Sequence, residues 1–329
     1  MGTMRELMRA GAAIVLSAVT VAWVPSSAQS QAQTWPQRPV RFILPLGPGS
    51  GVDITSRLLA DRLAARWGQS VVIENRPGGD GVVAVTAFTG AQDDHTLLMS
   101  PTSSFTHHPW THDKLPYDPR DLVPIARVTN TLVAVVVPAS SPINSLADLV
   151  AAVRAQPGKL NWATITGFFD FMFEGFQKKA NLEVARVPYR NTVQAANDLA
   201  EGRIQLMMSA FAIIRPLVQA GKLKMLAFTA PERASIAPDV PTAAEAGFPD
   251  LTIEGLVGLF GPRNLPAEAR ERIGADVREA LRDPAIAARL TETGQVVNPG
   301  TAAEFSAAID AQRAQAAAVG KLLGIKPAQ

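Results

Sequence analysis

The sequence predicts an α/β protein of two lobes with a ligand cleft between them. The chain has 329 residues, 47% of them hydrophobic, which is enough for more than one core. Short apolar segments alternate with segments of helical periodicity, as in a parallel sheet covered by helices. This alternation occurs in two successive sets, separated by an irregular, proline-rich stretch at 101–124.

The first residues have the pattern of an export signal. Arg5 and Arg9 precede an apolar run at 13–24, which is shorter than the ~20 residues that span a bilayer. Small side chains follow and suit a signal peptidase, so we predict a signal peptide over 1–28, cleaved after about Ala28. The two arginines are not adjacent, which favours a Sec-type signal and a periplasmic mature protein.

Composition excludes several classes of function. The chain has 31 Lys plus Arg against 29 Asp plus Glu and contains no basic run, so we expect no nucleic-acid partner. It has no cysteine, and therefore no lipidation site, disulfide or thiolate metal site. We expect a monomer without a cofactor.

The first set of elements begins with a buried strand at 39–45 and a glycine-rich turn from Gly47 to Gly51. The helix after this turn has apolar residues at helical spacing, namely Ile54, Leu58, Leu59 and Leu63. The other elements expected in this set are a strand at 71–74, a helix at 82–89 and a strand at 96–99.

The second set begins at Val128–Val137, a β-branched run that indicates one strand buried on both faces. This run and a later strand, Leu256–Phe260, are the expected crossings between the lobes. We therefore assign 29–131 and 261–329 to lobe I and 132–260 to lobe II. The other expected elements are helices at 145–155, 171–179, 192–201, 266–281, 284–293 and 301–323 and strands at 160–165, 185–187, 204–209 and 223–229.

Eight short blocks in this order resemble the Bug family of extracytoplasmic solute receptors, the receptors of tripartite tricarboxylate transporters. The blocks are Trp35 to Arg41, Pro45 to Asp53, Val72 to Gly79, Lys114 to Pro119, Pro157 to Asn161, Val187 to Arg190, Ala220 to Leu223 and Pro238 to Gly247. Together they cover nearly the whole mature chain. The resemblance implies a type II-like, two-lobed periplasmic binding protein that closes on a small carboxylic acid for uptake or sensing. The implied partners are the membrane subunits of such a transporter or a sensor kinase.

The turn from Leu46 to Ser50 is the predicted carboxylate site. It lies between a strand end and a helix start, where backbone N–H groups converge and the helix dipole favours an anion. The residues concerned are Leu46, Gly47, Pro48, Gly49 and Ser50, with Asp53 as a supporting residue that caps its own helix. The alternative is that these glycines only make a tight turn.

The resemblance adds further candidates. Thr102 and Ser103 lie in a hydroxyl-rich loop that faces the cleft in the family. In the second lobe the candidates are Thr166, Gly167, Phe168, Asp170, Tyr189 and Ser209. Asp170 stands roughly where relatives have a histidine, and Ser209 where they often have an aspartate. The extra phenylalanines after Gly167 and the missing acid predict an aromatic or branched carboxylate as the ligand.

Two enzyme classes stay open as alternatives. The spacing Gly47-x-Gly49-x-Gly51 after a strand is similar to a dinucleotide-binding turn, and Glu74 ends the next strand, so a nucleotide-cofactor enzyme is one of them. A periplasmic hydrolase is the other, although no serine lies in the nucleophile-elbow pattern. We expect a binding protein without catalytic residues.

A histidine cluster is predicted to be a solvated loop. His108 and His112 have a spacing that suits a metal ion on a helix, but Pro109 and Pro116 argue against a helix there. His107 lies in the same loop, but the spacing fixes no third ligand, and we expect no metal site.

Overall fold

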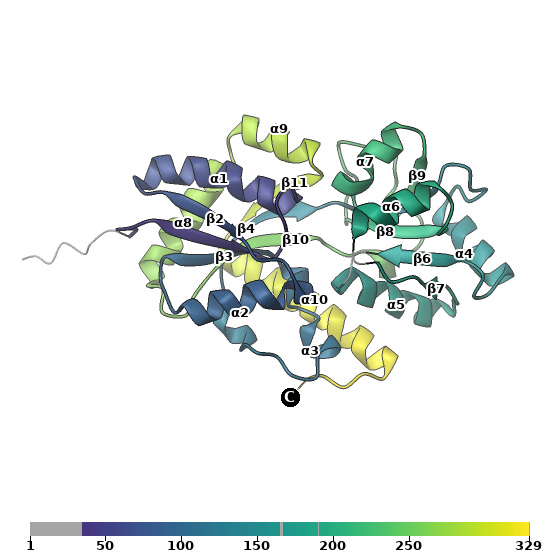
Figure 1. Ribbon diagram of the computed structural model, residues 1–329, viewed down its shortest axis with the longest axis horizontal. Helices are drawn as coiled ribbons and strands as arrows, with labels where there is room; N and C mark the ends of the chain where they lie inside the picture. The colour runs from purple at the N-terminus through teal and green to yellow at the C-terminus, as the bar shows by residue number, and fades with distance from the viewer. Residues whose placement is uncertain (1–34, 165–166, 190, 329) are drawn as a thin grey trace, which may run out of the picture. The chain divides into compact units, whose positions relative to one another are not determined.

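The computed structural model describes residues 35–164, 167–189 and 191–328. The predicted signal peptide at 1–28 and Thr166 lie outside the described residues. Within the described ranges, no helix is both long enough and apolar enough to cross a membrane. These ranges contain two β-sheets with helices packed on both faces of each (Figure 1).

The first sheet has six strands in the order β11-β4-β10-β3-β1-β2. They are β1 (Val40–Leu44), β2 (Val71–Asn75), β3 (Thr96–Pro101), β4 (Val123–Thr131), β10 (Leu256–Gly261) and β11 (Gln295–Gly300). β1 is parallel to β2 and β3, whereas β10 runs antiparallel to β3 and β4, and β11 antiparallel to β4. The predicted strand–helix alternation of the first set is confirmed by the parallel part of this sheet.

Alternate side chains of β1 point into two different cores. Val40 and Phe42 pack with three helices on one face, namely α1 (Gly51–Trp67), α8 (Ala267–Ala280) and α9 (Pro284–Glu292). Ile43 packs on the opposite face with α2 (Val82–Ala91) and α10 (Ala302–Leu323). Phe305 of α10 packs directly on the sheet at Gly258 of β10, where a Cβ atom would overlap the Phe305 ring.

The second sheet has five strands in the order β7-β6-β8-β5-β9. They are β5 (Val133–Pro138), β6 (Asn161–Thr164), β7 (Ala185–Arg186), β8 (Leu206–Ala210) and β9 (Leu223–Phe228). One face packs against α4 (Leu146–Ala155) and α5 (Phe168–Ala180), and the other against α6 (Thr192–Ala200) and α7 (Phe211–Gln219). Together with the first sheet, this gives the two-lobed α/β fold that the sequence predicted.

The prediction of one strand over Val128–Val137 is wrong. The chain leaves the first sheet at the end of β4 and enters the second sheet at the start of β5, with Leu132 between them. The Leu132 N–H donates to the Gly294 carbonyl and its carbonyl accepts from the Phe211 N–H, each at 2.8 Å. β10 pairs along its whole length in the first sheet. The lobe boundaries at 131/132 and 260/261 stay a prediction.

Some elements were not predicted at all. These are α3 (His108–Thr111), α7, β11 and the short 3-10 turns η1 (Gly79–Gly81), η2 (Thr102–Ser104), η3 (Pro119–Asp121) and η4 (Pro249–Leu251). Proline hides two of them, because Pro109 lies in the first turn of α3 and Pro216 lies inside α7. In β11, the sequence ends in Asn-Pro-Gly, which is typical of a turn.

Candidate functional site

The glycine turn joins β1 to α1 as predicted and is held by its own hydrogen bonds. Gly49 has φ +81°, a conformation that favours glycine. Ser50 is the N-cap of α1, because its Oγ accepts from the Asp53 N–H at 3.2 Å. The N–H groups of Gly51 and Val52 belong to the first turn of the helix, where no carbonyl within the helix can accept them. These two N–H groups and the Ser50 hydroxyl proton are therefore donors that this turn can offer to an anion.

Asp53 does not cap the helix as expected, because Ser50 does. Its buried carboxylate instead accepts from the Gly49 N–H at 2.9 Å, and from the Asn75 side-chain amide at 3.0 Å. Burial raises the pKa of the Asp53 carboxyl, but hydrogen bonds from Arg57, Gly49 and Asn75 outweigh it and hold that pKa below its ordinary value. The Gly49 N–H is thus bound to Asp53 and cannot donate to a ligand, so the turn has fewer free donors than the sequence predicted.

The remaining first-lobe candidates differ in exposure. The Leu46 carbonyl accepts from the Asn75 side chain at 2.8 Å, while Pro48 is exposed. Thr102 is fully buried and its hydroxyl donates to the Gln312 side chain of α10 at 2.5 Å. Ser103 is half-buried in η2. Of the two predicted hydroxyls, Ser103 is the one with exposed surface.

The second-lobe candidates fall into separate places. Gly167 is the N-cap of α5, and Asp170 lies in the first turn of the same helix. Tyr189 precedes α6, and its hydroxyl donates at 2.8 Å to Asp198 near the end of that helix. Ser209 is fully buried in β8 and bonds weakly to the next carbonyl, at 3.4 Å. Gly167 and Asp170 share a cavity, which Tyr189 and Ser209 do not line.

That cavity, of about 250 Å³, is lined by residues from both predicted lobes. Its lining residues are Asp80, His107, Thr111, His112, Gly167, Asp170, Phe171, Glu174 and Arg186. The Asp80 carboxylate lies against Gly167, where the Oδ2 atom would be 2.7 Å from a Cβ atom, so a larger residue at position 167 would displace Asp80. The sequence did not single out Asp80, although it lies in a glycine-rich turn at the same sheet edge as the predicted anion site.

The solvated histidine loop is a second wrong prediction. His107 and His108 are both fully buried, and they lie at and just inside the start of the short helix α3. His107 Nε2 lies 2.7 Å from an Asp80 carboxylate oxygen. His108 bonds to the Tyr117 hydroxyl and to the Asp80 carbonyl, at 2.5 Å and 3.0 Å. Burial, and then the neighbouring His107, lower the pKa of His108 to about 4.

The phenylalanines of α5 serve mainly as core. Phe168, Phe169 and Phe173 are buried in the cluster that includes Trp162 of β6, while Phe171 both packs there and lines the cavity. Of the α5 phenylalanines that the sequence placed at the ligand, only Phe171 lines the cavity between the described residues.

Asp170 is a buried acid, and its burial disfavours the ionised form. Burial raises the pKa of its carboxyl to about 6, although the ion pair with Arg186 lowers it. One carboxylate oxygen, Oδ1, has no hydrogen-bond partner among the described residues.

The pKa of Asp170 predicts a pH dependence of stability. Because the folded value of about 6 exceeds the ordinary 3.8, the folded state binds the proton more tightly. This tighter proton binding stabilises the folded state by at most about 3 kcal/mol. The stabilisation is fully present below pH 4 and is lost as the pH rises through 6. Asp170→Asn should flatten the melting temperature between pH 4 and pH 7, measured by circular dichroism. Glu174→Gln, in the same cavity, should keep most of the slope, and an unchanged slope in Asp170→Asn would contradict the assignment.

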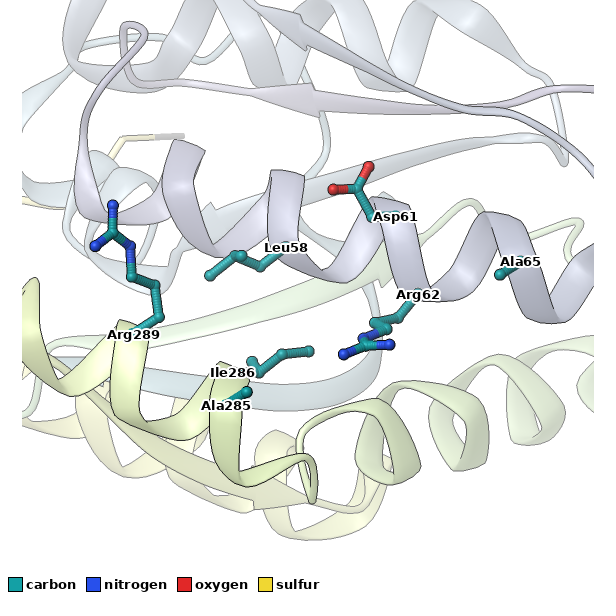
Figure 2. A pocket seen from close by; sticks show the side chains of 7 residues that line it. All are labelled: Leu58, Asp61, Arg62, Ala65, Ala285, Ile286 and Arg289. Atoms are coloured by element: carbon teal, nitrogen blue, oxygen red, sulfur yellow. The ribbon is translucent and has the colours of Figure 1, made fainter.

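A second cavity, of about 400 Å³, lies between α1 and α9 (Figure 2). Leu58 and Ile286 form part of its apolar lining, and Arg62 pairs with Asp283 at 2.5 Å. It is lined by helical residues rather than by the strand ends where the predicted site lies, so it takes no part in that site.

The two-lobed α/β fold is that of periplasmic solute-binding proteins, and comparisons with known proteins identify the family. Residues 55–325 match the family described as Tripartite tricarboxylate transporter family receptor, and the chain belongs to this family. It is 31% identical over 334 residues to a UPF0065 protein of Bordetella bronchiseptica, covering 99% of this chain and 95% of that one. The resemblance seen in the sequence is therefore confirmed.

Two solved structures are also similar over nearly their whole length. The R. palustris protein Rpa4515, solved with adipate, has a TM-score of 0.79 at 28% identity and covers 89% of this chain and 99% of its own. MatC from Rhodopseudomonas palustris, solved with bound malate, has a TM-score of 0.75 at 27% identity and covers 87% of this chain and 99% of its own.

Proposed function

We propose that this protein is a periplasmic receptor that captures a small carboxylic acid between its two lobes, for uptake or sensing, and catalyses no reaction on it. The observation that carries the proposal is the turn at the start of α1. There the N–H groups of Gly51 and Val52 and the hydroxyl of Ser50 are available beside an exposed glycine. An anion bound there interacts with the positive end of a 17-residue helix.

A neutral or cationic ligand fits this turn less well than an anion. Two N–H groups and one hydroxyl all need an acceptor on the ligand. The nearby Asp53 carboxylate cannot serve a cationic ligand, because it already accepts from Arg57, Asn75 and the Gly49 N–H. The solved relatives with adipate and malate support a carboxylate as that acceptor. The proposed first-lobe wall is the turn Leu46, Gly47, Pro48, Gly49 and Ser50, and Ser103 is a further proposed contact from the same lobe. Gly167 and Asp170 belong to the proposed second-lobe wall.

The finer identity of the ligand is a separate proposal. The departures from the family around Gly167 and Ser209 favour an aromatic or branched acid, whereas the burial of most α5 phenylalanines leaves Phe171 as the ring that supports it. We propose further that the receptor is a monomer that delivers its ligand to the membrane subunits of a transporter or to a sensor kinase.

A thermal-shift panel of carboxylic acids tests the proposal. A ligand that binds only the folded state stabilises it by mass action and so raises the melting temperature. At a ligand concentration a hundred times Kd, the free energy of unfolding rises by about 2.7 kcal/mol. We expect at least one acid to do this and to be recovered unchanged after incubation, as mass spectrometry would show. Shifts from dicarboxylates alone would contradict the aromatic or branched assignment. Shifts only from esters, with hydrolysis, or only from nucleotides would overturn the receptor proposal in favour of an enzyme.

A further inference from the structure

Asp80, His107 and His108 bring three metal-ligating groups together at one wall of the 250 Å³ cavity. One ligand atom from each lies within 4.8 Å of the other two. Asp80 Oδ2 is 2.7 Å from His107 Nε2 and 3.8 Å from His108 Nε2. In a tetrahedral zinc site, ligands at about 2.0–2.1 Å from the metal lie about 3.3 Å apart. Each of the two measured distances differs from that spacing by about 0.6 Å or less.

The three groups are also held in place by the rest of the fold. Both imidazoles are fully buried, whereas the Asp80 side chain is 30% exposed toward the cavity that would admit an ion. In the metal-free protein His108 Nε2 donates to the Asp80 carbonyl at 3.0 Å, and a metal ion would replace this hydrogen bond. Nδ1 would then carry the proton and donate it to the Tyr117 hydroxyl, which lies 2.5 Å away and fixes the ring. Asp80 has φ +53° and is fixed between glycines at 79 and 81.

The charge of the cavity favours a cation. Its lining includes the carboxyl groups of Asp80, Asp170 and Glu174 against one guanidinium, that of Arg186. Imidazole combined with carboxylate is a ligand set that suits zinc and neighbouring transition metals better than calcium or magnesium. Without a metal ion, His107 Nε2 and the Asp80 carboxylate form a hydrogen bond, which a bound metal ion would replace.

We propose that Asp80, His107 and His108 bind one divalent transition-metal cation of the zinc class, with the open coordination position facing the cavity. None of the three ligands belongs to the proposed carboxylate turn, although Gly167 and Asp170 of the proposed second-lobe wall line the same cavity. Metal binding at these ligands does not require a bound acid.

Cobalt is the probe for the test, because tetrahedral Co²⁺ with nitrogen and oxygen ligands absorbs visible light. The purified protein is stripped with EDTA and titrated with Co²⁺ and then Zn²⁺ by absorbance and calorimetry. We expect one equivalent of Co²⁺ to bind, an absorption band to appear and Zn²⁺ to displace it. Asp80→Asn, which tolerates the same backbone conformation, should weaken Co²⁺ binding at least about tenfold.

Two further variants sharpen the result. His107→Gln should also weaken binding, with circular dichroism of the metal-free protein confirming that it is folded. His112→Gln is the matched control, since His112 lines the same cavity but is not one of the three ligands. No Co²⁺ band in the wild type, unaltered affinity in Asp80→Asn, or a loss only in His112→Gln would overturn the site. The carboxylic-acid panel repeated in EDTA reports on the receptor function alone, so the two failures are distinguishable.

Discussion

Gly258→Ala should destabilise the protein by about 3 kcal/mol or more, because the added methyl group has no space. Gly258 lies in β10, between β3 and β4. A Cβ atom there would overlap the Phe305 ring and would lie 2.7 Å from the backbone oxygen of Ala126. Phe305 is itself fully buried and packs against Phe260, with ring centroids 5.1 Å apart, so it cannot move aside easily. Urea denaturation followed by circular dichroism measures the loss.

The matched control is Gly47→Ala. Gly47 has no atom within 4 Å of a Cβ position and no positive φ, so this change should leave stability nearly unaltered. Combining Gly258→Ala with Phe305→Leu should cost less than the sum of the two single changes, because the smaller side chain relieves the overlap. Additive losses would mean that Phe305 is not the obstacle.

Gly49→Val is expected to weaken carboxylate binding at least about tenfold, which corresponds to about 1.4 kcal/mol. A β-branched residue at φ +81° is strained by about 1–3 kcal/mol, so the turn must change shape. That change would displace Ser50 and the first N–H groups of α1, which are the proposed contacts. Ser50→Ala, in contrast, removes one hydroxyl and should weaken binding only a few-fold. Calorimetric titration with an acid identified by the thermal-shift panel measures both.

Gly68→Val controls for backbone strain. Gly68 is the C-cap of the same helix, with φ +65° and no atom within 4 Å of a Cβ position. The substitution should lower the melting temperature in the same way as Gly49→Val and leave the affinity unaltered. If both variants bound the acid like the wild type, the turn would not be the anchor.

The sequence predicted the elements that periodicity marks and missed those that depend on distant partners. The strand–helix alternation placed β1, α1 and β2 within a few residues, because each carries its own apolar pattern. The split at Leu132 is not visible, since the β-branched run continues through it and only hydrogen bonds from Gly294 and Phe211 separate the two strands.

The same limit applies to the site. The glycine turn could be predicted because its residues are contiguous, with the N-cap and positive φ encoded locally. The cavity beside α5 could not, since Asp80, His107 and Asp170 come from three segments that only the folded chain brings together. Proline near His108 indicated a loop, but Pro109 is compatible with the first turn of a helix.

The strand order also fixes which sheet can form first during synthesis. β4 has no neighbour in the first sheet except β10 and β11, which come from the end of the chain. A nascent chain that has reached residue 228 therefore contains every strand of the second sheet, whereas β3 and β4 of the first still expose unpaired edges. A Sec-exported chain folds as it emerges on the far side of the membrane, again from its N-terminus. The later-encoded lobe is therefore expected to complete its sheet before the earlier one, and the first sheet needs protection from aggregation until β10 is inserted.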